Sequence, residues 1–317
     1  MTTPRRLSLD RIAEAATVID PVFLDSPQFL AESLGAELGC RLVVKVETLN
    51  PIRSFKGRGT EFLTASLDGK PHLTCATAGN FGQGMAWSAR KRGFPITVFS
   101  ATTANPLKVE RMRFLGAEVR QVGRDFDEAH QAATEFARSQ GARLIEDGRD
   151  VEIAEGAGTI GMELSRWPER FDDVVVPLGD GALLAGIARW IKAEHPATRV
   201  IGVCAAGAAA MERSWRAGEL RDLPADTIAD GIAVTSPFAE ALSDITGVID
   251  EVLTVEDALL VSAIRRAHRD LGIVLEPAGA AGLAAVQSHS GLFRGRLVAT
   301  VLSGGNATAE QLGKWLA

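Results

Sequence analysis

The sequence predicts an α/β protein of two lobes, in which open, mostly parallel sheets are covered by helices. At 317 residues the chain is long enough for more than one hydrophobic core. Short runs rich in β-branched residues alternate with stretches of helical periodicity. The runs are continuously apolar, which is typical of parallel strands that are buried on both faces.

The predicted elements alternate along the whole chain. The runs that predict strands cover residues 41–47, 95–99, 117–119, 174–176, 199–203 and 297–301. The stretches that predict helices cover residues 82–92, 106–115, 126–139, 182–194 and 256–271. The segments around 68–72 and 140–150 read as crossings between lobes. We therefore expect a large discontinuous domain of residues 1–68 and 143–317, and a small mobile domain of residues 69–142.

Composition excludes several classes of partner. A net charge of −6 provides no basic surface for nucleic acid or an anionic membrane. No apolar run approaches the roughly 20 residues that span a bilayer, and the N-terminus lacks the apolar segment of a signal peptide. The three cysteines lie far apart, which predicts neither a disulfide framework nor a metal-binding knuckle. We expect a reducing, cytoplasmic location.

The most informative side chain is Lys56, in the run Ser54-Phe55-Lys56-Gly57-Arg58-Gly59 after the first predicted strand. A lysine at such a turn can form a Schiff base with a carbonyl compound or with pyridoxal phosphate. Most lysines are instead solvated at the surface, and the motif alone leaves both interpretations open.

Two segments have the order strand, glycine turn, helix: residues 77–84 and residues 179–186. Free amides at a helix N-terminus bind anions such as phosphate, although a tight turn alone also explains such glycines. A dinucleotide site at 179–186 is disfavoured, because Leu184 occupies the third glycine position and no acidic residue ends the next strand. Asp180 would repel a phosphate unless it points away.

Two further segments place polar groups beside predicted elements. Ser303 ends the last buried strand in Ser303-Gly304-Gly305-Asn306, at the edge where α/β folds bind ligands. Glu276 precedes a helix in Glu276-Pro277-Ala278-Gly279-Ala280. A helix cap is the competing interpretation of both segments.

Taken together, the motifs resemble the serine/threonine dehydratase (threonine ammonia-lyase) family, which belongs to the fold-type II pyridoxal-phosphate enzymes of the tryptophan synthase beta-like superfamily. The resemblance runs in order from Asp25 to Asn306. It rests on the lysine motif, the Ala78-Gly79-Asn80 loop with Gln83-Gly84, and the segments at 179–183, 276–280 and 303–306. It implies two domains, each with an open parallel sheet, and pyridoxal 5′-phosphate as the cofactor.

The resemblance also implies roles for individual residues. Lys56 would be the catalytic Schiff-base lysine, Asn80 would bind the cofactor's 3′-oxygen, and Ser303 would lie on its pyridine nitrogen. The expected cofactor-binding residues are Phe55, Lys56, Asn80, Gly179, Asp180, Gly181, Ala182, Leu183, Glu276, Ser303 and Gly304. The expected substrate-binding residues are Arg53, Thr77, Ala78, Gly79, Asn80 and Gln83.

Several positions depart from the family's pattern. Arg53 adds a cation beside the lysine motif, and Asp180 and Ala182 replace glycines in the phosphate loop. Serine racemases keep an acidic metal site after the next strand, where this chain has Cys204, Ala208 and Ala210, so no metal is expected. Ala78 stands where serine racemases carry a reprotonating serine, and this favours elimination over racemisation.

The expected reaction is therefore the elimination of water from threonine or serine, which gives a 2-oxo acid and ammonia. Lys56 would remove the Cα proton, with its pKa lowered by burial or by the cations Arg53 and Arg58. Alternatives are another β-substituted amino acid such as 3-hydroxyaspartate, which Arg53 could select, or a non-catalytic ligand-binding relative. The family suggests a homodimer. Because the chain ends near the last motif, no C-terminal regulatory domain is expected.

Overall fold

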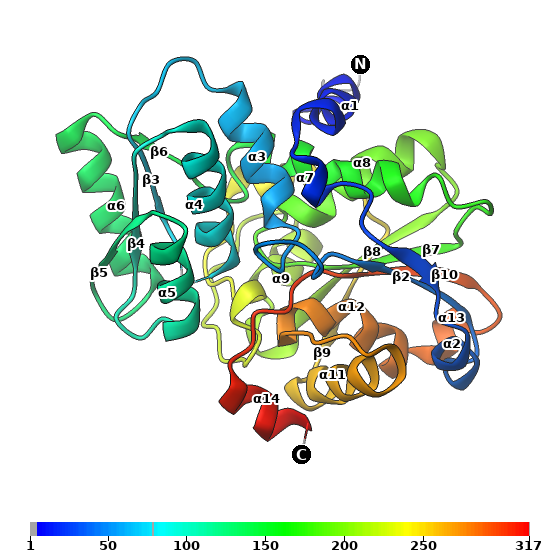
Figure 1. The fold of residues 1–317 in the computed structure, drawn as a ribbon. Helices are drawn as coiled ribbons and strands as arrows, with labels where there is room; N and C mark the ends of the chain where they lie inside the picture. Colours follow the sequence, from blue (N-terminus) through cyan, green and yellow to red (C-terminus); the bar gives the residue numbers. More distant parts are fainter. Residues whose placement is uncertain (1–4, 78, 317) are drawn as a thin grey trace.

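A computed structural model provides the structure, which describes residues 5–77 and 79–316. Its larger sheet contains the strands β1 (Gln28–Leu30), β2 (Arg41–Val46), β7 (Asp173–Pro177), β8 (Arg199–Ala205), β9 (Glu251–Val255) and β10 (Leu297–Leu302). They lie in the order β1-β2-β10-β7-β8-β9 (Figure 1). Every neighbouring pair is parallel except β1 with β2. The carboxyl ends of the five parallel strands therefore share one edge, where the loops can meet.

The smaller sheet contains β3 (Leu73–Ala76), β4 (Ile96–Ser100), β5 (Glu118–Gln121) and β6 (Arg143–Leu144). The strand order is β5-β4-β3-β6, and all pairs are parallel. This sheet and its helices form a separate body on the left of Figure 1. β6 pairs within this sheet, so the sheet extends two residues beyond the border expected at residue 142.

Helices separate most of the strands, as predicted. The α-helices are α1 (Leu9–Val18), α2 (Glu32–Leu38), α3 (Lys56–Ser66), α4 (Asn80–Arg92), α5 (Pro106–Phe114), α6 (Phe126–Gln140), α7 (Val151–Leu164), α8 (Ala182–Glu194), α9 (Ala210–Ala217), α10 (Ala239–Ile245), α11 (Asp257–Leu271), α12 (Pro277–Ser288), α13 (Ser290–Phe293) and α14 (Ala309–Leu316). Short 3-10 turns are η1 (Pro21–Phe23), η2 (Ala206–Ala208) and η3 (Asp230–Ile232). Within the described residues, no helix is long and apolar enough to cross a membrane.

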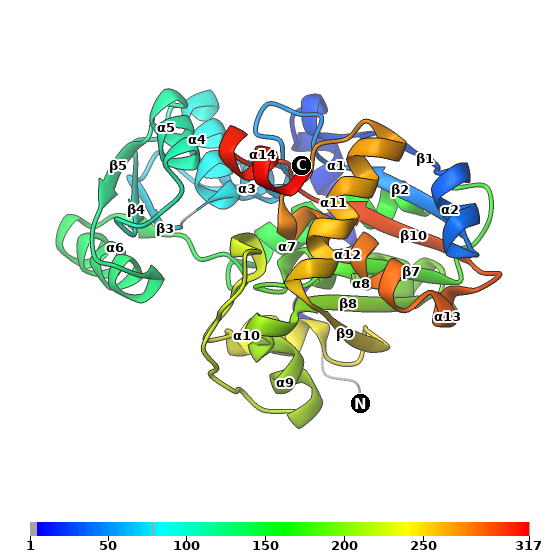
Figure 2. The same cartoon turned by 90° about the horizontal axis from the view of Figure 1, so that it is seen from below.

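The larger sheet is covered on both faces, with α7 and α8 on one side and α11 and α12 on the other (Figures 1 and 2). Successive residues of β7 show why its run is continuously apolar. Val174 and Val176 belong to the cluster that includes Ile187 of α8, whereas Val175 belongs to the cluster that includes Leu283 of α12. Side chains alternate across a strand, so a strand covered on both faces needs apolar residues throughout. The predicted α/β architecture is confirmed.

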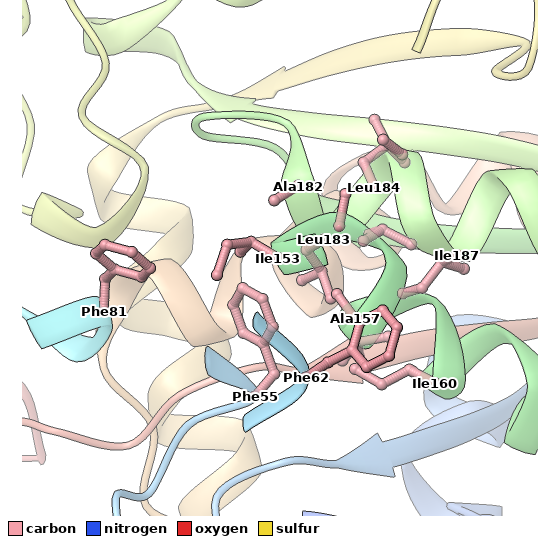
Figure 3. Close-up of a cluster of buried hydrophobic side chains, with 14 of the residues drawn as sticks. Phe55, Phe62, Phe81, Ile153, Ala157, Ile160, Ala182, Leu183, Leu184 and Ile187 are labelled. Carbon is pink, nitrogen blue, oxygen red and sulfur yellow. The ribbon is translucent and has the colours of Figure 1, made fainter. Parts of the chain in front are cut away.

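An apolar cluster between α3, α7 and α8 fixes the elements that carry the site (Figure 3). It contains Phe55, Phe62, Ile153, Ala157, Ile160, Leu183 and Ile187, among others. A Cβ on Gly186 would lie 2.1 Å from the carbonyl oxygen of Ala154, so α7 and α8 approach too closely for any side chain there. This packing holds the first turn of α3 and the first turn of α8 in one rigid arrangement.

Candidate active site

A cavity of about 410 Å³ lies between the two sheets, next to the carboxyl ends of the larger sheet's strands. Most of the residues that the motifs singled out line it. They are Phe55, Lys56, Thr77, Gly79, Asn80, Gly179, Asp180, Gly181, Leu183, Glu276 and Ser303. Segments that are far apart in the sequence therefore meet in one place.

Lys56 is the first residue of α3, and the preceding loop holds it firmly. The side chain of Asn50 braces this loop, because its Oδ1 accepts the N–H groups of Ile52 and Ser54. The N–H of Phe55 donates to the carbonyl of Ser303, which ties the start of α3 to the end of β10. The Lys56 side chain is only 9% exposed, and its Nζ lies 4.7 Å from the centre of the Phe55 ring.

Two carboxylates hold the Nζ of Lys56. The distance from Nζ to Asp147 Oδ2 is 2.5 Å, and the distance to Asp180 Oδ2 is 3.0 Å. Burial alone would lower the pKa of Lys56, but the two negative charges outweigh it and raise that pKa. In this state Lys56 is an ammonium ion.

The pKa values of the two carboxyl groups are shifted in opposite directions. Burial, together with the charge of Asp180, raises the pKa of Asp147 to about 7. Burial would also raise the pKa of Asp180, but the charge of Lys56 and the hydrogen bonds it receives hold that pKa below its ordinary value. When two carboxyl groups share a site, the proton stays on the one with fewer donors.

Arg53 and Arg58 do not supply the cations that were expected to lower the pKa of Lys56, and this prediction is wrong. Arg58 is fully buried and points to Glu47 and Glu163, with Nη–Oε distances of 2.8 and 2.6 Å. Arg53 is exposed, adopts a left-handed backbone with φ of 51°, and does not line the cavity. The charged groups next to Lys56 are instead two carboxylates, Asp147 and Asp180, which come from two other loops.

The loop before α8 has the geometry of an anion site. Gly181 has φ of +103°, a conformation that favours glycine, and α8 begins at the next residue. Asp180 Oδ1 accepts the N–H of Ala182 at 3.1 Å, so a carboxylate already occupies a helix N-terminal amide. A phosphate group has the same preference for such amides. With Lys56 in the same cavity, these residues fit pyridoxal phosphate.

On the opposite wall, Asn80, Glu276 and Lys108 form a connected polar group. The amide nitrogen of Asn80 donates to Glu276 Oε1, and Lys108 Nζ lies 3.1 Å from Glu276 Oε2. Lys108 also lies 2.7 Å from Asp230 Oδ2. Burial alone would lower the pKa of Lys108, but Glu276 and Asp230 raise it. A Cβ on Gly304 would lie 2.0 Å from Glu276 Oε1, so a larger residue there would displace the Glu276 carboxylate from this group.

Other expected site residues lie outside the cavity wall. Gln83 is buried, and neither atom of its side-chain amide has a hydrogen-bond partner within residues 5–77 and 79–316. Ala182 and Gly304 are buried next to wall residues, but neither lines the cavity. Ala78 lies outside the described residues. Within those residues, no group of three or more His, Cys, Asp or Glu side chains is placed to bind a metal ion.

The cavity residues that the sequence reading missed include Lys108, His130 and Asp147. Asp147 follows the short strand β6, in a segment interpreted only as a crossing between lobes. Its place three residues after a strand, next to Glu146, was the available signal, because polar groups after parallel strands gather at one sheet edge. Lys108 and His130 lie within predicted helices and carry no motif.

Comparisons with known proteins agree with this geometry. The family model described as pyridoxal-phosphate dependent enzyme matches residues 19–304. An L-threonine ammonia-lyase of Geobacter sulfurreducens is 37% identical over 281 residues, which cover 87% of this chain and 70% of that protein. A biosynthetic L-threonine dehydratase of Lactococcus lactis is 30% identical over 311 residues, which cover 95% of this chain and 75% of that protein.

Two solved structures share the fold over nearly their whole length. A threonine deaminase from Solanum lycopersicum, isoform 2 in its processed form, superposes with a TM-score of 0.89 and 30% identity, covering 99% of this chain and 94% of that one. Maize serine racemase superposes with a TM-score of 0.91 and 26% identity, covering 97% and 96%. These matches confirm the fold class and show that the chain belongs to the pyridoxal-phosphate dependent enzyme family, in the serine/threonine dehydratase group that its motifs resemble.

Proposed function

We propose that this protein is a pyridoxal-phosphate dependent ammonia-lyase that converts threonine or serine into a 2-oxo acid and ammonia. The observation that carries the proposal is the position of Lys56 in a cavity that also contains Asn80, Glu276, Ser303 and the loop before α8. The similarity to threonine ammonia-lyases and dehydratases over most of the chain supports the reaction class.

The chain's own residues divide the work as follows. Lys56 would hold the cofactor and would take the Cα proton of the substrate. The amides at the start of α8 other than that of Ala182 would hold the phosphate, and Asn80 with the amides at the start of α4 would bind the substrate carboxylate and the cofactor's 3′-oxygen. The Ser303 hydroxyl would serve the pyridine nitrogen. The bound cofactor supplies the electron sink that makes the Cα proton acidic.

Charge in the cavity argues for a substrate without an acidic side chain. Its wall carries the carboxylates Asp127, Glu146, Asp147, Asp180, Asp230 and Glu276, against the two lysines Lys56 and Lys108. Arg53, the cation that favoured 3-hydroxyaspartate, lies outside this wall. A second carboxylate on the substrate would meet repulsion, whereas the neutral hydroxyl of threonine or serine would not.

We further propose a homodimer in a reducing, cytoplasmic compartment. The family suggests the dimer, and light scattering on the purified protein tests it. All three cysteines are buried and unpaired, which supports a reducing environment.

Release of 2-oxo acid from threonine and serine tests the proposal. Purified protein loaded with pyridoxal phosphate should turn over one or both substrates, and Lys56→Ala should turn over neither. Lys70→Ala is the matched control, because Lys70 is an exposed lysine outside the cavity. If the wild-type protein acts on neither amino acid, the proposed function is wrong.

A further inference from the structure

The proposed elimination needs an acid as well as a base. A hydroxide ion is a poor leaving group, so the β-hydroxyl must receive a proton as the Cβ–O bond breaks. None of the motif residues provides a side chain for that step. The structure places two carboxyl groups at the reacting lysine, Asp147 and Asp180.

The hydrogen bonds of these carboxyl groups differ. Both oxygens of Asp180 accept donors, Oδ1 from the N–H of Ala182 and Oδ2 from Lys56. Asp147 contacts Lys56 through Oδ2 alone, and among the residues that the structure describes its buried Oδ1 has no hydrogen-bond partner. Donors stabilise the ionised form, so Asp180 keeps its charge and a shared proton resides on Asp147. The free oxygen of Asp147 leaves room for one more hydrogen bond.

Burial, together with the negative charge of Asp180, raises the pKa of Asp147 and favours its protonated state, although the charge of Lys56 opposes this shift. The groups that face it are Lys56 from α3, Asp180 from the loop before α8, and Cys75 from β3. Burial and the charge of Asp147 raise the pKa of the Cys75 thiol to about 12, so that thiol is neutral. The adjacent Glu146 is directed to His130 of α6, with an Oε1–Nε2 distance of 2.8 Å.

We propose that Asp147 is the acid that protonates the leaving hydroxyl, and that Asp180 keeps this proton on Asp147. The assignment rests on the proposed elimination from threonine or serine. Asp180 is then a positioning residue, because it acts through Asp147. Asp147 is accessible to a substrate in the cavity, because its side chain is 15% exposed and lines the cavity wall.

The proton balance closes with residues that the structure brings together. Lys56 takes the Cα proton, and the electrons of the Cα–H bond become the second bond between Cα and Cβ. Asp147 gives its proton to the hydroxyl oxygen, which leaves with the Cβ–O electron pair as water. The Lys56 ammonium then returns a proton to Asp147 across their 2.5 Å contact, so that Lys56 is again the neutral base and Asp147 again the acid for the next turnover.

Dependence on the leaving group tests the assignment. Threonine and serine need an acid, whereas the chloride of β-chloroalanine leaves without a proton. We expect Asp147→Asn to lower kcat with threonine by about 10²–10⁴-fold, the usual contribution of a general acid, and to leave kcat with β-chloroalanine nearly unchanged. Asp68→Asn, which changes an exposed carboxyl outside the cavity, should change neither. Equal losses on both substrates would overturn the assignment.

A second measurement needs no turnover. Isotope-edited infrared spectra of the cofactor-free protein should show a protonated carboxyl group that persists at neutral pH, is absent from Asp147→Asn and remains in Asp68→Asn. A signal that survives in Asp147→Asn contradicts the proposal. If that variant does not fold, the pH dependence of the wild-type protein tests the proposal. Turnover of threonine should fall as Asp147 loses its proton at higher pH. Turnover of β-chloroalanine should not show that decline. A shared decline contradicts the proposal.

These outcomes separate the two levels of the argument. If the wild-type protein releases no 2-oxo acid from threonine or serine, the proposed function is wrong, and so is the role of Asp147. An active wild type whose Asp147→Asn variant loses threonine and β-chloroalanine turnover equally ends only the role of Asp147.

Discussion

Two buried lysines line the same cavity, and each lies between two carboxylates. Lys56 contacts Asp147 and Asp180, and Lys108 contacts Asp230 and Glu276. In both clusters the carboxylates raise the lysine pKa against the effect of burial. The clusters differ in where their members come from and in how their carboxyl oxygens are satisfied.

Lys108 belongs to α5, which packs beside the smaller sheet, and it reaches carboxylates on η3 and at the start of α12 in the larger body. Glu276 is tied in turn to Asn80, so this cluster joins the two bodies across the cavity. Within the described residues, Glu276 Oε2 and Asp147 Oδ1 are both buried without a hydrogen bond, but Glu276 Oε2 lies 3.1 Å from the Lys108 ammonium, whereas no cation contacts Asp147 Oδ1. The same charge pattern therefore suits positioning at Lys108 and proton transfer at Lys56, and the contacts of the carboxyl oxygens decide which.

The largest expected effect is on catalytic activity, which should depend on Lys56 far more than on Lys108. Lys56→Ala removes both the cofactor bond and the base, so we expect kcat/KM with threonine to fall by more than about 10⁴-fold. The visible absorbance of the lysine-bound cofactor should also disappear. Lys108→Met should keep that absorbance. A Lys108→Met variant that loses the absorbance while remaining folded would contradict the division of roles.

For the free energy of unfolding we expect the opposite order: a substitution at Lys108 should destabilise the protein more than one at Lys56. Lys108→Met leaves the buried Glu276 carboxylate unpaired, and we expect a loss of about 3 kcal/mol in the free energy of unfolding. Asp230 is 45% exposed and adds little. Lys56→Met should cost less, because Asp147 can take up a proton and remove its repulsion with Asp180. Urea unfolding of the cofactor-free proteins measures both losses. Glu276→Gln should recover part of the loss in the Lys108→Met background.

The pH dependence of stability sharpens the comparison further. The folded pKa of Asp147 is about 7, above the ordinary value near 4 that applies to the unfolded chain. Between these values the unfolded state releases this proton first, so the contribution of Asp147 to stability falls as pH rises from about 4 to 7. The slope is at most about 1.4 kcal/mol per pH unit. We expect Asp147→Asn to remove this decline, as measured by thermal unfolding of the cofactor-free protein across that range.

The smallest effect concerns Arg53, which was expected to bind substrate. Because Arg53 is exposed and outside the cavity wall, Arg53→Ala should change kcat/KM for threonine by less than about twofold, as is usual for a surface side chain that makes no contact at the site. Steady-state kinetics with threonine and serine check this. A large increase in KM would instead indicate that Arg53 binds the substrate.

Much of the fold was predictable because parallel strands that are covered on both faces leave a clear sequence pattern. β2, β4, β5, β7, β8 and β10 all overlap the runs predicted as strands. β1, β3, β6 and β9 match none of these runs, and for β1 and β6 the reason is that two or three residues carry no periodicity. The motif residues around Lys56 were also predictable, since loops after parallel strands converge on one edge.

The charged groups around the reacting lysine were not predictable in the same way. Arg53 and Arg58 are near Lys56 in the sequence, yet one lies at the surface and the other is committed to Glu47 and Glu163. Asp147 lies 91 positions away from Lys56 in the sequence and 2.5 Å away in space. Electrostatic shifts depend on distances through space, which a short motif does not record.

The sequence by itself determined the α/β architecture, the family and Lys56, because periodicity and ordered motifs are local properties of the chain. Only the tertiary structure decided that carboxylates rather than arginines surround Lys56, that Lys108 joins the two bodies, and that Asp147 Oδ1 has no hydrogen-bond partner in the part of the chain that the structure describes. Those features arise from loops that meet only when both sheets are in place. Burial and distance then set which group holds the proton.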